Sequence, residues 1–173
     1  MVTSYKKLVV NQMKSALCTL AQCIANCPEM EWNESHGDYP FSQVVFHTLF
    51  FTDYYLERDE STLKTQVFHI ENKAFFRDYE ELEYKEPKNL YERQKCDEYL
   101  KFCVNKCKAT LRLDNQETLQ GPSGFSSKPF SRAELYVQAI RHIQHHAAQL
   151  GLRIQRITGN ELKWISSGWR NDC

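Results

Sequence analysis

Residues 132–157 read RAELYVQAIRHIQHHAAQLGLRIQRI, and this stretch carries the clearest structural pattern in the chain. Its apolar side chains recur at steps of three and four residues, which is the period of an amphipathic α-helix. Ser131 with Glu134 three residues later is typical of a capping box, and Gly159 is a residue type that commonly ends a helix. We therefore predict a helix from about Arg132 to Ile157.

Three further segments have the same helical period. They run from about Ser4 to Asn26, from about Phe41 to Arg58 and from about Leu90 to Leu113. Pro28 stops the first of them, because proline lacks a backbone donor and clashes with the preceding turn. Ser42 is a candidate cap for the second, and Asn89 followed by Glu92 resembles a capping box for the third.

The connection between the second and third helices, residues 59–88, is about thirty residues long, which is long for a simple hairpin. It suits a bundle in which these two helices run parallel and the connection crosses between them. The tail after Thr158 carries Trp164 and Trp169, which we expect to pack back on the helices. The sequence therefore predicts one all-α domain over residues 1–173, a four-helix bundle with a long crossover.

Composition limits the class of protein. The 173 residues suit one domain, and 22 Lys and Arg balance 22 Asp and Glu, so the chain lacks the basic surplus typical of nucleic-acid binding. The longest nearly uncharged stretch, residues 41–52, is shorter than the roughly 20 apolar residues of a membrane span. The first residues also lack the apolar run of a secretory signal. We expect a cytoplasmic protein with neither a nucleic-acid nor a membrane partner.

Two histidines lie within the apolar stripe of the last predicted helix. On a helical wheel at about 100° per residue, His146 lies about 40° from His142, and Leu135 and Ala139 lie on the same side. A buried imidazole without a partner costs roughly 1–3 kcal/mol. A shared metal ion would remove that cost, because side chains at i and i+4 project together and bonds of about 2.0–2.1 Å from nitrogen to zinc fit this spacing.

The second predicted helix offers a third ligand. His47 lies on a face with Val44, Phe51 and Tyr55, and an antiparallel or crossing helix pair can bring it to the other two histidines. Three neutral imidazoles would leave coordination positions open for water or substrate, as in catalytic sites. A single core histidine is more often satisfied by a carbonyl or a tyrosine hydroxyl, so the pattern alone leaves both a metal site and simple packing open.

The segment Ile140–Leu152, IRHIQHHAAQLGL, resembles the fourth-helix signature of the DinB-like (DinB/YfiT) superfamily, in which HxxxH is followed by a small residue and Gln. Residues 41–56, FSQVVFHTLFFTDYYL, are similar to the other histidine-bearing helix of that family. The order of four helices and the long second link also match, so the resemblance covers about residues 4–158. Ala148 stands before Gln149 where many members have glycine, which changes local packing but not the ligands.

This resemblance implies a four-helix bundle with up-up-down-down topology and a divalent metal ion, often nickel or zinc, held by three histidines. Carried over residue by residue, the metal ligands are His47, His142 and His146. Characterised relatives include S-transferases and isomerases that use low-molecular-weight thiols, whose pKa the metal lowers. The resemblance thus implies a small-molecule substrate such as a thiol.

Three functions stay open on these grounds. The first is a metal-dependent thiol S-transferase. The second is a metal-dependent hydrolase with bound water as the nucleophile, which a carboxylate base near the histidines would favour, although none is evident on the histidine-bearing faces. The third is a non-catalytic metal or ligand binder, with a homodimer formed through an exposed helix face.

The cysteines could form a second site. Cys23 and Cys27 are one turn apart on the first helix, and Cys103 and Cys107 are one turn apart on the third. If these faces met, the four thiolates could bind zinc, or a disulfide could join the two helices. We favour free thiols, because cysteine is a common small core residue and the chain carries no secretory signal.

Other polar residues have simpler interpretations. Asp53 lies opposite His47 on the wheel, so we do not expect it to be a ligand, and Tyr54 and Tyr55 either bond to a ligand or pack. The remaining histidines are expected at the surface or its edge: His36, His69 and His145. The acidic run in the crossover is also expected to face solvent: Glu80, Glu81, Glu83 and Glu86.

Overall fold

The computed structural model describes residues 2–77, 79–83 and 87–168, and over these residues it is helical and without strands. Its four long helices are α1 (Val2–Asn26), α2 (Phe41–Leu56), α5 (Arg93–Leu113) and α7 (Arg132–Thr158). Six short ones lie between them: η1 (Glu29–Glu31), η2 (Leu63–Thr65), α3 (Val67–Glu71), α4 (Lys73–Phe76), η3 (Glu80–Leu82) and α6 (Gln116–Gln120). The predicted all-α class is confirmed.

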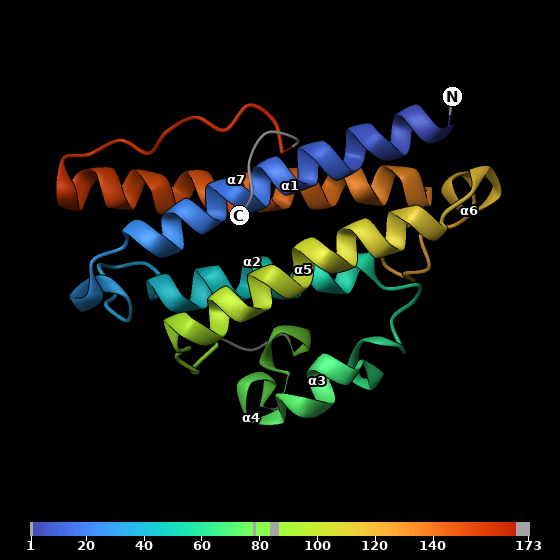
Figure 1. Ribbon diagram of the computed structural model, residues 1–173. Helices are drawn as coiled ribbons and strands as arrows, with labels where there is room; N and C mark the ends of the chain where they lie inside the picture. Colours follow the sequence, from blue (N-terminus) through green and yellow to red (C-terminus); the bar gives the residue numbers. More distant parts are fainter. Residues whose placement is uncertain (1, 78, 84–86, 169–173) are drawn as a thin grey trace.

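The four long helices lie side by side, with α1 and α2 each packed against both α5 and α7 (Figure 1). Helices α1 and α7 run parallel. The Tyr5 hydroxyl donates to the Ala133 carbonyl near both helix starts, and the Cys23 thiol donates to the Ala147 carbonyl further along both. None of the helices in the described part of the chain is long and apolar enough to cross a membrane.

Helices α2 and α5 also run parallel, as the long connection predicts. The Cys103 thiol donates to the Leu49 carbonyl at 3.6 Å, and the Thr110 hydroxyl donates to the Leu56 carbonyl about two turns later at 3.5 Å. The described residues of the intervening segment, 57–77, 79–83 and 87–92, lie along this pair and carry η2, α3, α4 and η3, the green region at the lower edge of Figure 1.

The order of directions differs from up-up-down-down. The ammonium of Lys6, at the start of α1, donates to the carbonyl of Arg112 at the end of α5, and the Arg93 guanidinium at the start of α5 donates to Ile24 at the end of α1. Helix α1 is therefore antiparallel to α5 and to α2, and the four helices run up, down, down and up. The connection after α1, residues 27–40, turns the chain back into α2.

The ends of α7 are those that the sequence predicts. The Ser131 hydroxyl accepts from the Glu134 amide at 3.2 Å, and Gly159 follows the helix at φ 74°, a left-handed conformation in which glycine has no steric penalty.

The caps predicted for α2 and α5 are wrong. Helix α2 begins directly after Pro40, so Ser42 lies within its first turn and is fully buried. Helix α5 begins after Glu92 and has no side-chain cap, because Asn89 instead bonds to Arg77 of the crossover.

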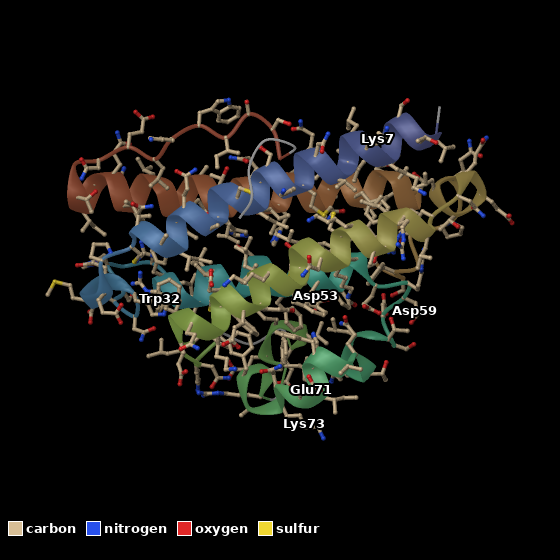
Figure 2. The ribbon with its side chains drawn as sticks, viewed as in Figure 1. Lys7, Trp32, Asp53, Asp59, Glu71 and Lys73 are labelled. Atoms are coloured by element: carbon tan, nitrogen blue, oxygen red, sulfur yellow. The ribbon has the colours of Figure 1, made fainter. Side chains whose placement is uncertain are left out.

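The apolar faces of the four helices form one core. Its largest fully buried side chains include Met13, Phe46, Phe50, Tyr99 and Tyr136. Each large apolar side chain buried in this way contributes roughly 1.5–3 kcal/mol. Figure 2 shows Asp53 inside this assembly between α2 and α5, whereas Lys73 extends outward from the crossover.

The crossover buries a histidine that the sequence places in solvent. His69 on α3 is 1% exposed, and its ring stacks on Phe76 with centroids 3.6 Å apart. The expectation of a solvated residue is wrong because α3 turns its polar residue inward onto α2, while Val67 and Ile70 face outward. His36 agrees with its prediction: it is exposed and pairs with Glu31 at 2.6 Å.

The tail after α7 lies along α1, as predicted, but the side chain of Trp164 does not pack on the helices. The Ser15 hydroxyl donates to the Ile165 carbonyl at 2.6 Å, and the Gly168 amide donates to Asn11 at 3.1 Å. Trp164 is 80% exposed, so the prediction that it packs on the helices is wrong. Trp169 lies outside the described residues.

Candidate metal centre

Three imidazoles from α2 and α7 converge on one point. His47, His142 and His146 each offer one ligand nitrogen, and these atoms all lie within 4.8 Å of one another. The Nε2 atoms of His47 and His142 are 3.2 Å apart, and the rings of His142 and His146 are 4.6 Å apart between centroids. Two such nitrogens bound to one ion at about 2.1 Å would be separated by a similar distance.

The helices explain this convergence. His142 and His146 are one turn apart on α7, so their side chains project from the same strip of the helix. Helices α2 and α7 run in opposite directions, because Arg153 of α7 bonds to Tyr39 just before α2 while His142 meets His47 further along α2. His47 therefore faces this strip from across the helix interface. The structure therefore brings together the three histidines that the sequence singled out, and they could hold a metal ion.

The cluster is half-buried rather than fully buried. On α7, His146 lies between the fully buried Leu135 and Ala139 in the view down the helix, as the wheel placed it. The cluster is nevertheless open on one side, because a pocket lies beside it. The expectation of a fully buried site is therefore wrong.

Two of the imidazoles favour the neutral form, which is the one that binds metal ions. Burial lowers the pKa of His142 to about 3, helped by the nearby His146 and His47. Burial and His47 lower the pKa of His146 to about 4, although its hydrogen bond with Gln149 acts in the opposite direction. At neutral pH these two rings therefore carry no proton that a metal would have to displace.

Hydrogen bonds fix which nitrogens are free. Nδ1 of His146 lies 2.8 Å from Oε1 of Gln149, which leaves Nε2 for a ligand. Nδ1 of His142 is buried and has no hydrogen-bond partner among the residues that the structure describes. His145 is exposed and contacts only the outer side of this group, with its ring 5.0 Å from that of His146.

A carboxylate from the crossover holds the third histidine. Oε2 of Glu81 lies 2.7 Å from Nδ1 of His47, and the Glu81 side chain is 6% exposed. Histidine ligands commonly bond to a carboxylate in this way, which fixes the ring and its tautomer. The prediction that the acidic run faces solvent is therefore wrong for Glu81. Glu83 is exposed as expected, and Glu86 lies outside the described residues.

Sequence reasoning missed Glu81 because it lies 34 positions after His47. Only the fold of the crossover, which returns along α2, brings η3 to this end of the histidine cluster. The one local signal is Leu82, an apolar residue within the acidic run that is half-buried against the core.

A pocket of about 410 Å³ opens beside the cluster. It is lined by Tyr39, Gln43, Val44, His47, Phe51, Glu80, Glu81, Glu83, Pro87 and His146. A pocket of this size holds a small organic molecule. Because two of the three histidines form part of its wall, a molecule in the pocket could reach an open coordination position.

The residues present fit a divalent ion. Imidazole nitrogens suit zinc and nickel, three of them leave positions open, and the third ring already has its supporting carboxylate. Within the described parts of the chain, no other group of three or more histidine, cysteine or acidic side chains lies close enough to hold a metal ion.

The cysteine alternatives are not realised. Cys23, Cys27, Cys103 and Cys107 are buried free thiols, so the prediction of plain thiols is confirmed for these four, and neither the zinc site nor the disulfide between the helices forms. Cys18 is disulfide-bonded, so the prediction of a free thiol is wrong for this residue. Burial raises the pKa of Cys23 to about 12 and that of Cys27 to about 11. These thiols are therefore poor nucleophiles. Cys173 lies outside the described residues.

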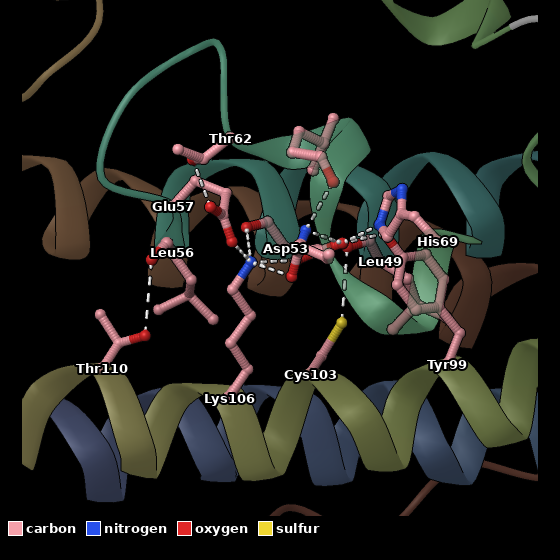
Figure 3. Close-up of polar contacts among 12 residues, drawn as sticks. Leu49, Asp53, Leu56, Glu57, Thr62, His69, Tyr99, Cys103, Lys106 and Thr110 are labelled. Carbon is pink, nitrogen blue, oxygen red and sulfur yellow. Dashed lines mark hydrogen bonds and ion pairs between the residues drawn. The ribbon is translucent and has the colours of Figure 1, made fainter. Parts of the chain in front are cut away.

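A second polar cluster lies between α2, α3 and α5 (Figure 3). Asp53 is fully buried and accepts from the Tyr99 hydroxyl at 2.7 Å, while His69 Nε2 lies 2.6 Å from the same oxygen. The ammonium of Lys106 pairs with both Asp53 and Glu57. Burial alone would raise the pKa of Asp53, but the His69 hydrogen bond and Lys106 together lower it. Asp53 is thus an ionised anchor and not part of the histidine cluster.

This anchor also supports the site indirectly. Nδ1 of His69 lies 3.0 Å from the Tyr79 hydroxyl, and Tyr79 directly precedes the η3 turn that carries Glu81. Of the two tyrosines on α2, Tyr55 is buried and its ring packs near that of Phe125, with centroids 6.0 Å apart.

Comparisons with known proteins found no match: no protein-family model, no curated protein and no solved structure matches this chain. The DinB-like resemblance therefore stays a prediction from the residues themselves.

Proposed function

We propose that this protein is a DinB-like four-helix bundle that binds one divalent metal ion, nickel or zinc, through His47, His142 and His146. The observation that carries the proposal is the convergence of these three imidazoles at the wall of a pocket of about 410 Å³. Two of the rings are held neutral by burial, and the third is supported by Glu81. These are properties of a site prepared for a metal ion rather than of a packed core.

We further propose that the protein is a thiol S-transferase acting on a small molecule. A bound divalent ion lowers the pKa of a coordinated thiol, so that the thiolate is available at neutral pH. The chain supplies the rest: Glu81 orients His47, and the apolar side chains Val44 and Phe51 exclude water from one side of the pocket. The buried thiols of Cys23 and Cys107 have raised pKa values and stay protonated, so we expect the nucleophile to come from the substrate.

A metal-dependent hydrolase is the second candidate. The sequence offered no carboxylate near the histidines, but Glu80, Glu81 and Glu83 line the pocket beside them. Two of these carboxylates already hold other groups in place, because Oε2 of Glu81 bonds to His47 and Oε2 of Glu80 accepts from the Lys88 and Asn89 amides. We rank hydrolysis second because a carboxylate that took a proton from water would weaken these bonds.

The remaining expectations belong to the same proposal. They are a cytoplasmic location, a small-molecule substrate, a homodimer formed through an exposed helix face, and the absence of nucleic-acid and membrane partners. Metal analysis of the purified protein, followed by turnover of a thiol with an electrophile, tests the proposal. One ion per chain with turnover supports the transferase; one ion without turnover of thiols or esters supports a non-catalytic binder; and no ion contradicts the whole proposal.

A further inference from the structure

The wall of the pocket beside the histidines combines imidazoles with carboxylates. His47 and His146 line it together with Glu80, Glu81 and Glu83. No lysine or arginine is among the described residues that line it. The wall of the pocket therefore carries negative charge.

Gln43 adds an independent sign of a ligand. This side chain is 5% exposed and lines the pocket. Its amide nitrogen donates to the carbonyls of Pro87 and Asn89, at 3.1 and 2.9 Å. Its amide oxygen Oε1 is buried and has no hydrogen-bond partner among the described residues. A buried acceptor without a donor is costly, and an N–H group on a ligand would satisfy it.

The bonds of the amide nitrogen also fix how this acceptor is presented. Because the nitrogen holds the Pro87 and Asn89 carbonyls of the segment that leads into α5, the amide cannot flip without losing both bonds. The oxygen is therefore held in place as an acceptor and cannot serve as a donor. Gln43 would accept from a ligand that carries N–H or O–H donors.

A metal ion on the histidines calls for a ligand group of the opposite charge. This step rests on the proposed function. Three neutral imidazoles would leave a bound divalent ion with its full positive charge, so the group that completes its coordination is best an anion such as a thiolate. Val44 and Phe51 also line the pocket and offer apolar surface for a short carbon chain.

We propose that the pocket selects a small aminothiol, with its sulfur on the ion held by the histidines and its protonated amine among the carboxylates of the wall, where it donates to Gln43. The charge of the ammonium matches the wall, and its three N–H donors match the unpartnered oxygen and the carboxylates. A thiol with a carboxylate in place of the amine would meet the same wall with the wrong charge.

The test compares three thiols that differ only in their end group. They are 4-aminobutanethiol, 4-mercaptobutanol and 4-mercaptobutyrate, whose four-carbon spacers disfavour chelation of the metal by the end group. Their dissociation constants are measured by calorimetry on protein loaded with zinc, at pH 7. We expect the amine to bind about tenfold more tightly than the alcohol and the carboxylate to bind most weakly.

Two variants locate the preference. Glu83→Gln removes an exposed charge from the wall and should weaken binding of the amine about threefold, with binding of the alcohol unchanged. Gln43→Met should reduce the preference for amine over alcohol further. Glu161→Gln, an exposed change outside the pocket, is the matched control and should alter neither thiol. Equal binding of the three thiols, or a preference that survives both pocket variants, overturns the aminothiol assignment.

A measurement without metal separates this inference from the proposed function. In the metal-free protein, n-butylammonium should shift the NMR resonances of the Gln43 side-chain amide, whereas n-butyrate should not. If zinc binds and neither the thiols nor the amines are discriminated, only the aminothiol assignment fails. If zinc does not bind but n-butylammonium still does, the carboxylates form a site for organic cations and the metal proposal fails.

Discussion

The pH dependence of metal binding follows directly from the lowered pKa values of two histidines. A proton competes with a metal ion for each imidazole that titrates. With pKa values of about 3 for His142 and about 4 for His146, at most about 3% of either ring is protonated at pH 5.5. Lowering the pH from 7.5 to 5.5 should therefore leave these two ligands ready for the ion.

The size of the loss of metal affinity at low pH distinguishes this site from three ordinary histidines. Three independent imidazoles with the usual pKa of about 6.5 would together weaken binding about a thousandfold over these two pH units. Here His142 and His146 do not compete with the ion. At most one proton per ion is then displaced, which limits the loss of affinity to about tenfold per pH unit, or about a hundredfold in all.

The assay is a competition between the protein and a chelator of known proton affinity, with zinc or nickel, at half-unit steps of pH. A plot of the logarithm of the dissociation constant against pH should have a slope no steeper than one. His36→Ala removes an exposed histidine outside the cluster and should not change the plot. A slope of two or three would refute the reasoning, because it would require His142 and His146 to titrate in the range where burial keeps them neutral.

The metal-free protein should lose stability as the pH falls from 6.5 towards 3. The pKa of His142 is lower in the folded chain, so the unfolded chain binds the proton first. Thermal unfolding should show a smaller loss of stability at low pH in His142→Phe than in wild type. Glu81→Gln should weaken zinc binding roughly tenfold or more, since the bond to His47 is weakened, with little change in melting temperature by calorimetry. Lys106→Met should cost about 3 kcal/mol in urea unfolding, because Asp53 is left with a buried charge short of one partner. Lys101→Met is the control: it breaks only the exposed ion pair between Lys101 and Asp97 and should leave the urea midpoint unchanged.

The sequence predicts what depends on local periodicity. The four long helices begin and end within two or three residues of their expected bounds. Each carries an apolar stripe that repeats over several turns, so its helical period is clear from the sequence. The convergence of His47 with the α7 pair was also predictable, since an HxxxH spacing and a histidine on a second apolar face leave few ways to pack two helices. Ser131 and Gly159 mark the ends of α7 because capping is decided within a few residues.

What the sequence could not predict depends on contacts between distant residues. His69 and Glu81 lie in a crossover without helical periodicity, and only its packing on α2 decides that both point inward. Asp53 was placed correctly on the wheel as lying away from His47, but its partners come from α3 and α5, which the wheel does not include. The direction of α2 relative to α1 likewise depends on how a short connection turns, and not on any pattern within the helices.

The most direct test of the account is the metal content of three proteins purified in the same way and dialysed against zinc or nickel. Wild type and His145→Ala should each retain about one ion per chain, whereas His142→Ala should retain none while keeping its helical circular dichroism. Retention of the ion by His142→Ala, or its absence from a folded wild-type protein, would contradict the claim that the three imidazoles form one metal site.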